Sequence, residues 1–345
     1  TNYRAELDFL NEADETFQFI AYAHEFKRLH ETKGTFNTTL PCQMDGTNNG
    51  LQILGMLTRD ESSCIATNVA PSDIPQDIYG IVALRARETM AQDDNPFANL
   101  WLQFGITRAC AKRPTMTQPY GSTPHSCRAY VNGWYLEQVR AGKPDPFDEE
   151  TRFQATAYLS THIWNAISHV VGRPREAMAW LQKTARKLAN AEKPMYWVSP
   201  SGFPCYQAYP KWMEKSIRTK IGEKVYRVKF REDTDKLSPK RQAQGSSPNF
   251  VHSLDAACLH LTVNRCAEQG INNFAMVHDS YGTHCTQADK LAYEIRQSMH
   301  QIFSDDQLLN LKTHLEHSNE LTLDPLPAYG SFDINDVLKS KYIFS

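Results

Sequence analysis

The fold of this chain is decided by the stretch Phe274-Ala275-Met276-Val277-His278-Asp279-Ser280-Tyr281-Gly282-Thr283. Residues with β-propensity lie on both sides of the pair His278-Asp279, so the stretch predicts a strand, a tight turn and a second strand. Much earlier, Leu40-Pro41-Cys42-Gln43-Met44 predicts a short strand that runs into the Gly-rich turn Asp45-Gly46-Thr47-Asn48-Asn49-Gly50. Each segment therefore places an aspartate at the end of a strand.

Two carboxylates at neighbouring strand ends would form a binding site for hard cations. Mg²⁺ is held by one or two carboxylates, and substrate phosphates complete its octahedron. Two such ions about 3.5–4 Å apart clamp the attacking and leaving oxygens of a phosphoryl transfer. Considered singly, Asp45 and Asp279 have a simpler interpretation, since an aspartate at a turn usually makes an Asx hydrogen bond. These segments alone leave both interpretations open.

The rest of the chain predicts a mixed α/β fold that is largely helical, with a small antiparallel sheet. We expect helices over residues 6–33, 50–57, 72–90, 97–112 with a stop near Pro114, 151–190 with a break at 172–174, and 250–269. Strands and a hairpin are expected between residues 194 and 232, where Tyr, Trp and Val are frequent. After Thr283 the sequence predicts one helix and a loose tail.

Positive side chains that could face phosphate oxygens follow Gly105. Arg108 and Lys112 lie one helical turn apart, so they share one face of the predicted helix. A guanidinium binds two phosphate oxygens at once, whereas Lys supplies a mobile point charge. Past this helix, Tyr120-Gly121 could offer an aromatic face to a base or a sugar. The alternative is a solvated helix face followed by an ordinary loop, and this pattern alone favours the alternative.

Two further segments could contact a nucleotide or a nucleic acid. In Pro248-Asn249-Phe250-Val251-His252-Ser253-Leu254-Asp255, the pair Pro248-Asn249 indicates a helix start and places His252 in the first turn. His252 could donate to a ligand hydroxyl, or it could be a capping or core histidine. Residues 211–231 contain eight Lys or Arg side chains. Such a segment suits a DNA groove or a single strand's backbone, or it is an ordinary charged hairpin.

Whole-chain composition limits the class of protein. The chain has 345 residues and a formal net charge of −2, so the strong basicity of many nucleic-acid binders is absent. Its eight cysteines form no Cys-x-x-Cys pair, and the start shows no signal peptide, so we expect reduced thiols in the cytoplasm. No apolar run reaches the ~18 residues that span a bilayer, so we expect no membrane contact.

The order of these segments resembles the motifs of the single-subunit DNA-dependent RNA polymerases of phages and mitochondria. Motif A of the family resembles Leu40-Pro41…Asp45-Gly46…Gly50-Leu51-Gln52. Motif B resembles Arg108…Lys112-Arg113…Tyr120-Gly121-Ser122, and motif C resembles His278-Asp279-Ser280-Tyr281-Gly282-Thr283. Three more family-like stretches are Gln76-Asp77-Ile78-Tyr79-Gly80-Ile81-Val82-Ala83, Trp197-Val198-Ser199-Pro200-Ser201-Gly202-Phe203-Pro204 and Pro248-Asn249-Phe250-Val251-His252-Ser253. The matches run in the family's order from about residue 35 to residue 285, and together they are highly specific.

The resemblance implies palm and fingers of a right-hand polymerase and a transfer of ribonucleotides that uses two Mg²⁺ ions. Asp45 and Asp279, with the Gly46 carbonyl, would bind these ions. The residues implied in nucleotide binding are Arg108, Lys112, Tyr120, Gly121, Tyr79 and His252. Arg108 and Lys112 would hold the triphosphate, whereas Tyr120 and His252 would contact the ribose. Its 2′-hydroxyl is the group by which proteins distinguish RNA from DNA precursors.

The resemblance also implies a division of the chain and a set of partners. Residues 1–73 and 253–345 would form the palm, and residues 74–252 the fingers with a basic hairpin near 211–231. The partners would be a DNA template, the RNA product and ribonucleoside triphosphates, in the cytoplasm of an infected bacterium. The family carries an amino-terminal domain, a thumb and an Asp-x-x-Gly-Arg element before motif A. We expect a second polypeptide to supply these parts, unless they were removed, because the chain resembles the larger subunit of a heterodimeric phage enzyme.

Several departures from the family pattern limit what the resemblance implies. Pro114 and Pro119 should shorten or kink the motif B helix, the hairpin region is not recognisably similar, and the end Tyr342-Ile343-Phe344-Ser345 differs from the family's aromatic-alanine end. Two other functions stay open: a fragment of a related DNA polymerase, and a non-catalytic DNA-binding subunit. Tyr120 and His252 favour the RNA enzyme over the first, and the intact aspartates argue against the second.

Overall fold

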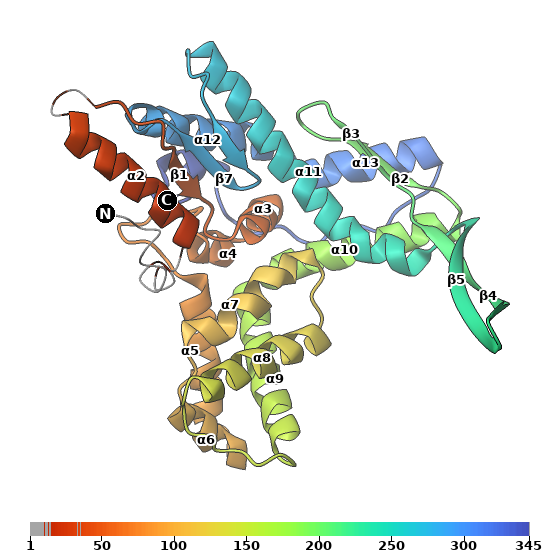
Figure 1. The fold of residues 1–345 in the computed structure, drawn as a ribbon. Coiled ribbons are helices and arrows are strands. Elements are labelled where there is room, and N and C mark those ends of the chain that lie inside the picture. Colours follow the sequence, from red (N-terminus) through yellow and green to blue (C-terminus); the bar gives the residue numbers. More distant parts are fainter. Residues whose placement is uncertain (1–9, 11–12, 14, 33, 35, 345) are drawn as a thin grey trace.

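The computed structural model of the protein describes residues 10, 13, 15–32, 34 and 36–344. This part of the chain is mixed α/β and largely helical, with small antiparallel sheets, which confirms the predicted fold class (Figure 1). The helices are α2 (Thr16–Thr32), α3 (Asn49–Thr58), α4 (Glu61–Ala66), α5 (Ile78–Ala91), α6 (Pro96–Phe104), α7 (Arg108–Thr117), η2 (Gln118–Tyr120), α8 (Pro124–Arg140), α9 (Arg152–Val170), α10 (Gly172–Asn190), α11 (Pro239–Glu268), η3 (Cys285–Gln287), α12 (Ala288–Ser304), α13 (Gln307–Asn319) and η4 (Ile334–Lys339), where η marks a 3₁₀ helix. The strands are β1 (Cys42–Asp45), β2 (Met195–Val198), β3 (Pro204–Gln207), β4 (Pro210–Ile221), β5 (Lys224–Leu237), β6 (Ala275–Val277) and β7 (Ser280–Thr283). None of the helices in these described ranges is long and apolar enough to cross a bilayer.

A three-stranded antiparallel sheet joins two segments that are far apart in the sequence. Its order is β1-β7-β6, so β7 lies between the other two strands. β6 and β7 form the predicted hairpin, in which Val277 pairs with Ser280 across the turn His278-Asp279. β1 pairs with β7 so that Asp45 lies opposite Ser280. The turn of the hairpin and the end of β1 therefore meet at the same end of the sheet.

The described residues form two large hydrophobic clusters. One contains side chains of α3 and of α10 to α13 and packs against the three-stranded sheet. The other consists mainly of side chains of α5 to α9, which form the lower part of the molecule as drawn in Figure 1. Along the sequence, Val171 is the last residue of the second cluster, and the clustered side chains from Ala177 onward belong to the first. The division into palm and fingers at residues 73 and 252 stays a prediction.

The basic hairpin predicted near residues 211–231 is formed by β4 and β5, spans residues 210–237 and stands away from the rest of the molecule (Figure 1). Directly paired residues of two antiparallel strands lie on the same face. One face carries the basic pair Arg218 and Arg227 and also Lys220, Lys229 and Arg231. The other face carries the apolar pair Ile217 and Val228 but also Lys215 and Lys224. The hairpin is therefore more basic on one side than on the other.

The structure has two helices where the sequence predicts one over residues 97–112. Gly105 ends α6 with a φ of 85°, a left-handed conformation that glycine adopts without strain. A stop near Pro114 is also wrong, because α7 continues to Thr117. Pro114 removes one backbone donor from the helix, but its side chain is buried, so packing offsets the lost hydrogen bond. Pro119 lies beyond α7, in η2.

The predicted helix start near Ser72 is wrong, because a local hydrogen bond closes a turn there instead. α5 begins at Ile78 rather than near Ser72, since the Ser72 hydroxyl donates to the Ile74 carbonyl and closes a turn (2.7 Å). The Asp77 side chain caps α5 by accepting from the Tyr79 N–H (3.2 Å). The predicted helix over 6–33 falls partly outside the described residues, and within them α2 spans Thr16–Thr32.

α11 begins at Pro239 and runs for 30 residues, so His252 lies in its interior and not in a first turn at Pro248. The Ser238 side chain accepts from the Arg241 N–H at the start of α11 (3.4 Å), and Pro239 fits the first helical position. The helix continues through Pro248 because side chains are buried on both sides of it, and Phe250 and Val251, just after it, belong to the first hydrophobic cluster. This burial outweighs one missing donor.

The end of the chain is packed rather than loose, and two helices precede it instead of one. After α12 and α13, the side chains of Ile343 and Phe344 enter the first hydrophobic cluster. The Gln52 side chain donates to the Ile343 carbonyl (2.8 Å), and Phe344 pairs with Gly46 in an antiparallel bridge. The sequence missed this because the partners of the tail lie almost three hundred residues away.

We predict that Trp101→Ala strongly destabilises the cluster formed by α5 to α9. The Trp101 ring is fully buried, packs edge-to-face on Phe104 and Tyr135, and donates from Nε1 to the Ala155 carbonyl (2.9 Å). Removing a buried aromatic side chain costs about 3–5 kcal/mol of unfolding free energy. Urea unfolding followed by circular dichroism measures the loss.

The matched control is Leu84→Ala on α5, since the Leu84 side chain is 48% exposed. Its cost should stay below about 1 kcal/mol. Equal costs for the two variants would contradict the packing described for Trp101.

Candidate active site

Asp45 and Asp279 lie side by side at one end of the three-stranded sheet. Asp45 is the last residue of β1 and pairs with Ser280, the residue that follows Asp279. The Gly46 N–H donates to the backbone carbonyl of Asp279 (3.4 Å). His278 has a φ of 52°, a conformation that residues with a side chain rarely adopt and that the two-residue turn between β6 and β7 requires. The structure thus brings together the two aspartates that the sequence singled out.

The charges of these two carboxylates are coupled. Loss of surrounding water raises the pKa of Asp45, the negative charge of Asp279 raises it further, and a backbone hydrogen bond from Gly46 opposes both effects. A divalent cation between the carboxylates would relieve their repulsion. Among the described residues no three His, Cys, Asp or Glu side chains are grouped to hold a metal ion. A cation here would therefore need further oxygen ligands, such as a backbone carbonyl or a phosphate.

Tyr120 and His252 form an aromatic pair close to Asp279. Their ring centroids are 4.9 Å apart and their planes are inclined by 34°. Tyr120 reaches this place because Gly50, at the start of α3, has no side chain. A Cβ on Gly50 would lie 2.8 Å from Pro119 Cβ and 3.1 Å from the Tyr120 hydroxyl. The structure therefore brings Tyr120 and His252 together, and their contact with a ribose stays a prediction.

Electrostatics keep both members of this pair uncharged near neutral pH. Burial raises the pKa of Tyr120 to about 12, with the negative charges of Asp279 and Asp255 as further causes. Burial lowers the pKa of His252, the nearby His278 lowers it further, and Asp279 opposes them. A protonated phenol and a neutral imidazole can each exchange hydrogen bonds with a hydroxyl group of a ligand.

Arg108 is connected to the same site through Tyr79. Its guanidinium lies 4.9 Å from the centroid of the Tyr79 ring and donates to the Asp77 carboxylate (2.9 Å). The Tyr79 hydroxyl donates to the carbonyl of Thr47, in the turn that follows Asp45 (3.2 Å). Lys112 lies one turn further along α7 and is exposed, in agreement with the predicted shared helix face.

Asp255 is a site residue that the sequence reasoning did not select. It lies one turn after His252 on α11, and its side chain is only 8% exposed. Asn49 Nδ2 donates to its Oδ1. Burial raises the pKa of Asp255 to about 6; the hydrogen bond from Asn49 and the charge of His278 lower it, whereas Asp279 raises it. The signal available in the sequence was an Asp among apolar residues, three positions after His252.

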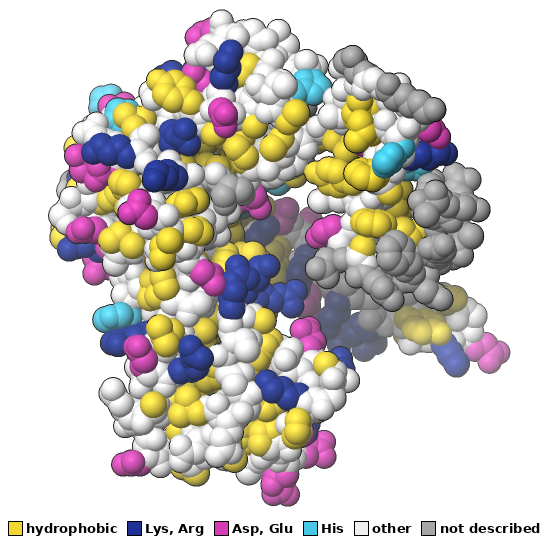
Figure 2. Space-filling view, turned by 90° about the vertical axis from the view of Figure 1, so that its left-hand side faces the viewer, with side chains coloured by type: hydrophobic (Ala, Val, Ile, Leu, Met, Phe, Trp, Pro, Cys, Tyr) yellow, Lys and Arg dark blue, Asp and Glu magenta, His cyan; other side chains and the backbone are white. Residues whose placement is uncertain are grey.

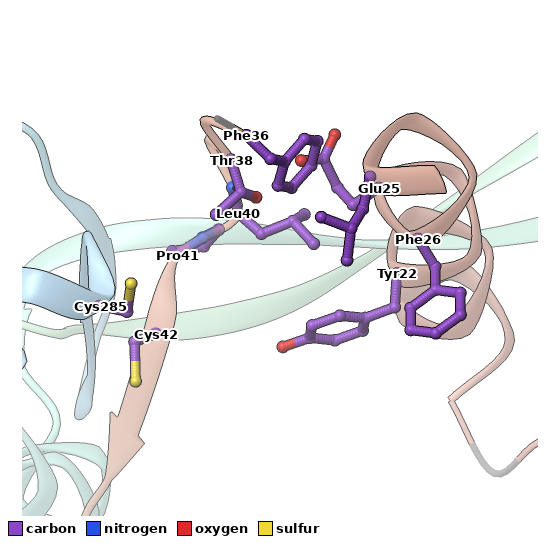
Figure 3. Close-up of a pocket in the computed structure, with 10 residues that line it drawn as sticks. Tyr22, Glu25, Phe26, Phe36, Thr38, Leu40, Pro41, Cys42 and Cys285 are labelled. Carbon is purple, nitrogen blue, oxygen red and sulfur yellow. The ribbon is translucent and has the colours of Figure 1, made fainter. Parts of the chain in front are cut away.

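One face of the molecule is hollowed, and Lys and Arg side chains gather about the hollow (Figure 2). A cavity of about 650 Å³ adjoins His252 and is lined by aromatic side chains that include Trp197, Phe203 and Tyr206. A second cavity, of about 330 Å³, lies between α2 and the segment that leads into β1 (Figure 3). Its lining is mainly apolar, with Tyr22, Phe26 and Phe36 among the side chains. Neither cavity is lined by Asp45 or Asp279, but the first adjoins the candidate site because His252 is part of its lining.

Known proteins match nearly the whole chain. A family model described as DNA-dependent RNA polymerase matches residues 1–320. The chain is 31% identical to the DNA-directed RNA polymerase of Enterobacteria phage T3 and 30% identical to the T7 RNA polymerase of Escherichia phage T7, in each case over 97% of this chain and 43% of the relative. It is 31% identical, over 89% of its length, to the mitochondrial DNA-directed RNA polymerase 1B of Nicotiana tabacum, of which it covers 30%. The chain belongs to the phage-type DNA-dependent RNA polymerase family, and it spans less than half the length of these relatives.

We predict that Asp255→Asn stabilises the protein at neutral pH but not at acidic pH. Because the pKa of Asp255 in the folded chain, about 6, is above its usual value, its protonation favours folding. This stabilisation is complete below about pH 4 and is lost as the pH rises through about 6. The amide variant has no such titration and can still accept the hydrogen bond from Asn49.

The measurement is the difference in unfolding free energy between Asp255→Asn and the wild type at pH 4.5 and pH 7.5. From pH 4.5 to pH 7.5, the unfolding free energy of the variant relative to the wild type should rise by on the order of 2 kcal/mol. A difference that does not depend on pH would show that Asp255 titrates normally in the fold.

Proposed function

We propose that this chain is the catalytic part of a DNA-dependent RNA polymerase that adds ribonucleotides to the 3′ end of a growing RNA. The observation that carries the proposal is the meeting of Asp45 and Asp279 at the end of β1 and the β6–β7 turn. Paired carboxylates with positive side chains nearby are what a nucleotidyl transfer requires, since its transition state spreads negative charge over phosphate oxygens.

The residues present fit a site for Mg²⁺. The Asp45 and Asp279 carboxylates and the Gly46 carbonyl would supply the oxygen ligands that this ion prefers. Burial raises the pKa of Asp45, the charge of Asp279 raises it further, and a bound cation would oppose both effects. Two Mg²⁺ ions bound there would supply stabilisation of the attacking and leaving oxygens.

The side chains around the carboxylates suit a ribonucleoside triphosphate. Arg108 and Lys112, on one face of α7, would bind the triphosphate, and Tyr79 would keep the Arg108 guanidinium in place through its ring. Tyr120 and His252 would contact the ribose, since both are held uncharged and can exchange hydrogen bonds with its hydroxyls. The left-handed Gly121 would end the turn that carries Tyr120 and belong to the nucleotide site.

In this proposal the RNA 3′-hydroxyl attacks the α-phosphate of the bound nucleotide. The hydroxyl gives up its proton to water, and its oxygen forms a bond to the α-phosphorus. The bond between the α-phosphorus and the oxygen that bridges to the β-phosphate breaks, and pyrophosphate leaves. Arg108 and Lys112 would then hold the charge on the leaving group. The aromatic cavity beside His252 and the basic face of the β4–β5 hairpin would contact the nucleic acid strands by stacking and by charge.

The partners follow from the same proposal. They are a DNA template, the RNA product, ribonucleoside triphosphates and a second polypeptide that supplies an amino-terminal domain, a thumb and an Asp-x-x-Gly-Arg element, as in a heterodimeric phage enzyme. The support for the second polypeptide is the resemblance of the chain to the larger subunit of such an enzyme. A longer form of the same chain is the alternative. The place of action would be the cytoplasm of an infected bacterium.

We predict that Asp279→Asn abolishes RNA synthesis while leaving DNA binding within about twofold of the wild type. Loss of one of two metal-binding carboxylates should lower the rate by on the order of 10³-fold or more. Primer extension by the complete polymerase measures the rate, and fluorescence anisotropy of a labelled template measures DNA binding.

The control for this variant is Asp94→Asn, because Asp94 is an exposed residue in the loop between α5 and α6. It should extend primers at the wild-type rate. Retained synthesis by Asp279→Asn would refute the assignment, and a polymerase that incorporates only deoxyribonucleotides would favour the alternative DNA enzyme.

We predict that Tyr120→Phe mainly relaxes the selection of the sugar. The ring would still pack on His252 and Gly50, so extension with ribonucleotides should stay within about threefold, whereas preference over deoxyribonucleotides should fall about tenfold because one hydroxyl contact is lost. Steady-state incorporation of matched ribo- and deoxyribonucleotides measures the ratio. Arrested extension with an unchanged ratio would show that the Tyr120 hydroxyl has another role.

A further inference from the structure

A buried hydrogen bond between Asn49 and Asp255 joins the two helices that flank the Tyr120–His252 pair. Asn49 is the first residue of α3 and is 5% exposed, and Asp255 is 8% exposed on α11. Asn49 Nδ2 donates to Asp255 Oδ1. The bond links the turn that follows Asp45 to the helix that carries His252.

The same two helices hold Tyr120 from two sides. On the α3 side, Gly50 comes directly after Asn49 and lies against Pro119 and the Tyr120 hydroxyl. On the α11 side, His252 lies one turn before Asp255, on the same helix face, and its ring packs on that of Tyr120. The Asn49–Asp255 bond therefore closes a ring of contacts around Tyr120.

Burial of the Asp255 carboxylate in this link costs folding free energy. None of the ion pairs found among the described residues includes Asp255, so the carboxylate is buried with an amide donor but without a cation. Asn49 Oδ1, on the same amide, has no hydrogen-bond partner in the described part of the chain. Buried ionisable groups with a raised folding cost are common at functional sites. If the link served stability alone, a neutral side chain in place of Asp255 would make the folded state more stable.

We propose that Asp255 is a positioning residue. Through its hydrogen bond with Asn49 it holds the start of α3 against Tyr120, and this contact determines how strictly the site selects ribose over deoxyribose. This inference rests on the proposed polymerase function. Without the bond, the first turn of α3 can move away from Tyr120, the Tyr120 hydroxyl gains freedom, and both sugars are accepted more equally.

The test compares Asp255→Ala, which removes the bond, with Asp255→Asn, which keeps an oxygen acceptor for Asn49. In primer extension by the complete polymerase, Asp255→Ala should lower the ratio of kcat/KM for a ribonucleoside triphosphate to that for its deoxy counterpart about tenfold. Asp255→Asn should restore the ratio to within about threefold of the wild type. A merely structural role would lower both kcat/KM values together and leave their ratio unchanged.

A control is available where the end of α11 meets α12, away from the site. Gln269 Nε2 donates to Glu294 Oε1 (2.6 Å), and Glu294 is 2% exposed, so this is also a bond from an amide to a buried carboxylate. Gln269→Ala should leave the sugar ratio unchanged. If Asp255→Ala does not fold, Asn49→Ala removes the same bond from its other end and should lower the ratio as much.

The outcomes separate this inference from the function on which it rests. A wild-type polymerase that makes no RNA would remove the proposed function and this inference with it. A wild-type polymerase that makes RNA, with an unchanged sugar ratio in folded Asp255→Ala or Asn49→Ala, would overturn the positioning role alone. An equal fall in Gln269→Ala would overturn it as well.

Discussion

The pairing of β1 with β7 is the interaction on which the site depends. These strands come from opposite ends of the chain, and their register places Asp45 opposite Ser280, next to Asp279. Because side chains alternate between the faces of a strand, a slip of one residue would turn Asp45 to the other face of the sheet. The backbone bond from Gly46 to the Asp279 carbonyl and the bridge from Gly46 to Phe344 hold this register at its end.

Three helical segments build the rest of the site on that sheet. α3 follows directly from β1, η2 follows α7, and α11 crosses both, so that Gly50, Tyr120 and His252 meet although each comes from a different part of the chain. Side chains from α7 are tied to the turn after Asp45 through the Tyr79 hydroxyl. The site thus lies where the two hydrophobic clusters meet, and the packing of these clusters fixes the distances between the site residues.

The sequence predicted the parts of this site whose signals are local. The β6–β7 hairpin, the end of β1 and the common face of Arg108 and Lys112 follow from patterns a few residues long. Features that arise from distant partners were missed, among them the packed tail at Phe344 and the buried Asp255. Helix limits at Pro114 and Pro248 were wrong because tertiary packing outweighs the loss of one backbone donor, a balance that no local pattern contains.

The central claim is that Asp45 and Asp279 act as one site for divalent cations. Electron paramagnetic resonance of Mn²⁺ measures the concentration of free ion as protein is added. The proteins to compare are the wild type, Asp45→Asn, Asp279→Asn and the double variant. One shared site predicts that each single change weakens Mn²⁺ binding about tenfold or more and that the double change adds little, since either change already removes the shared site. Losses that simply add in the double variant, or a single variant that binds Mn²⁺ as the wild type does, would contradict the account.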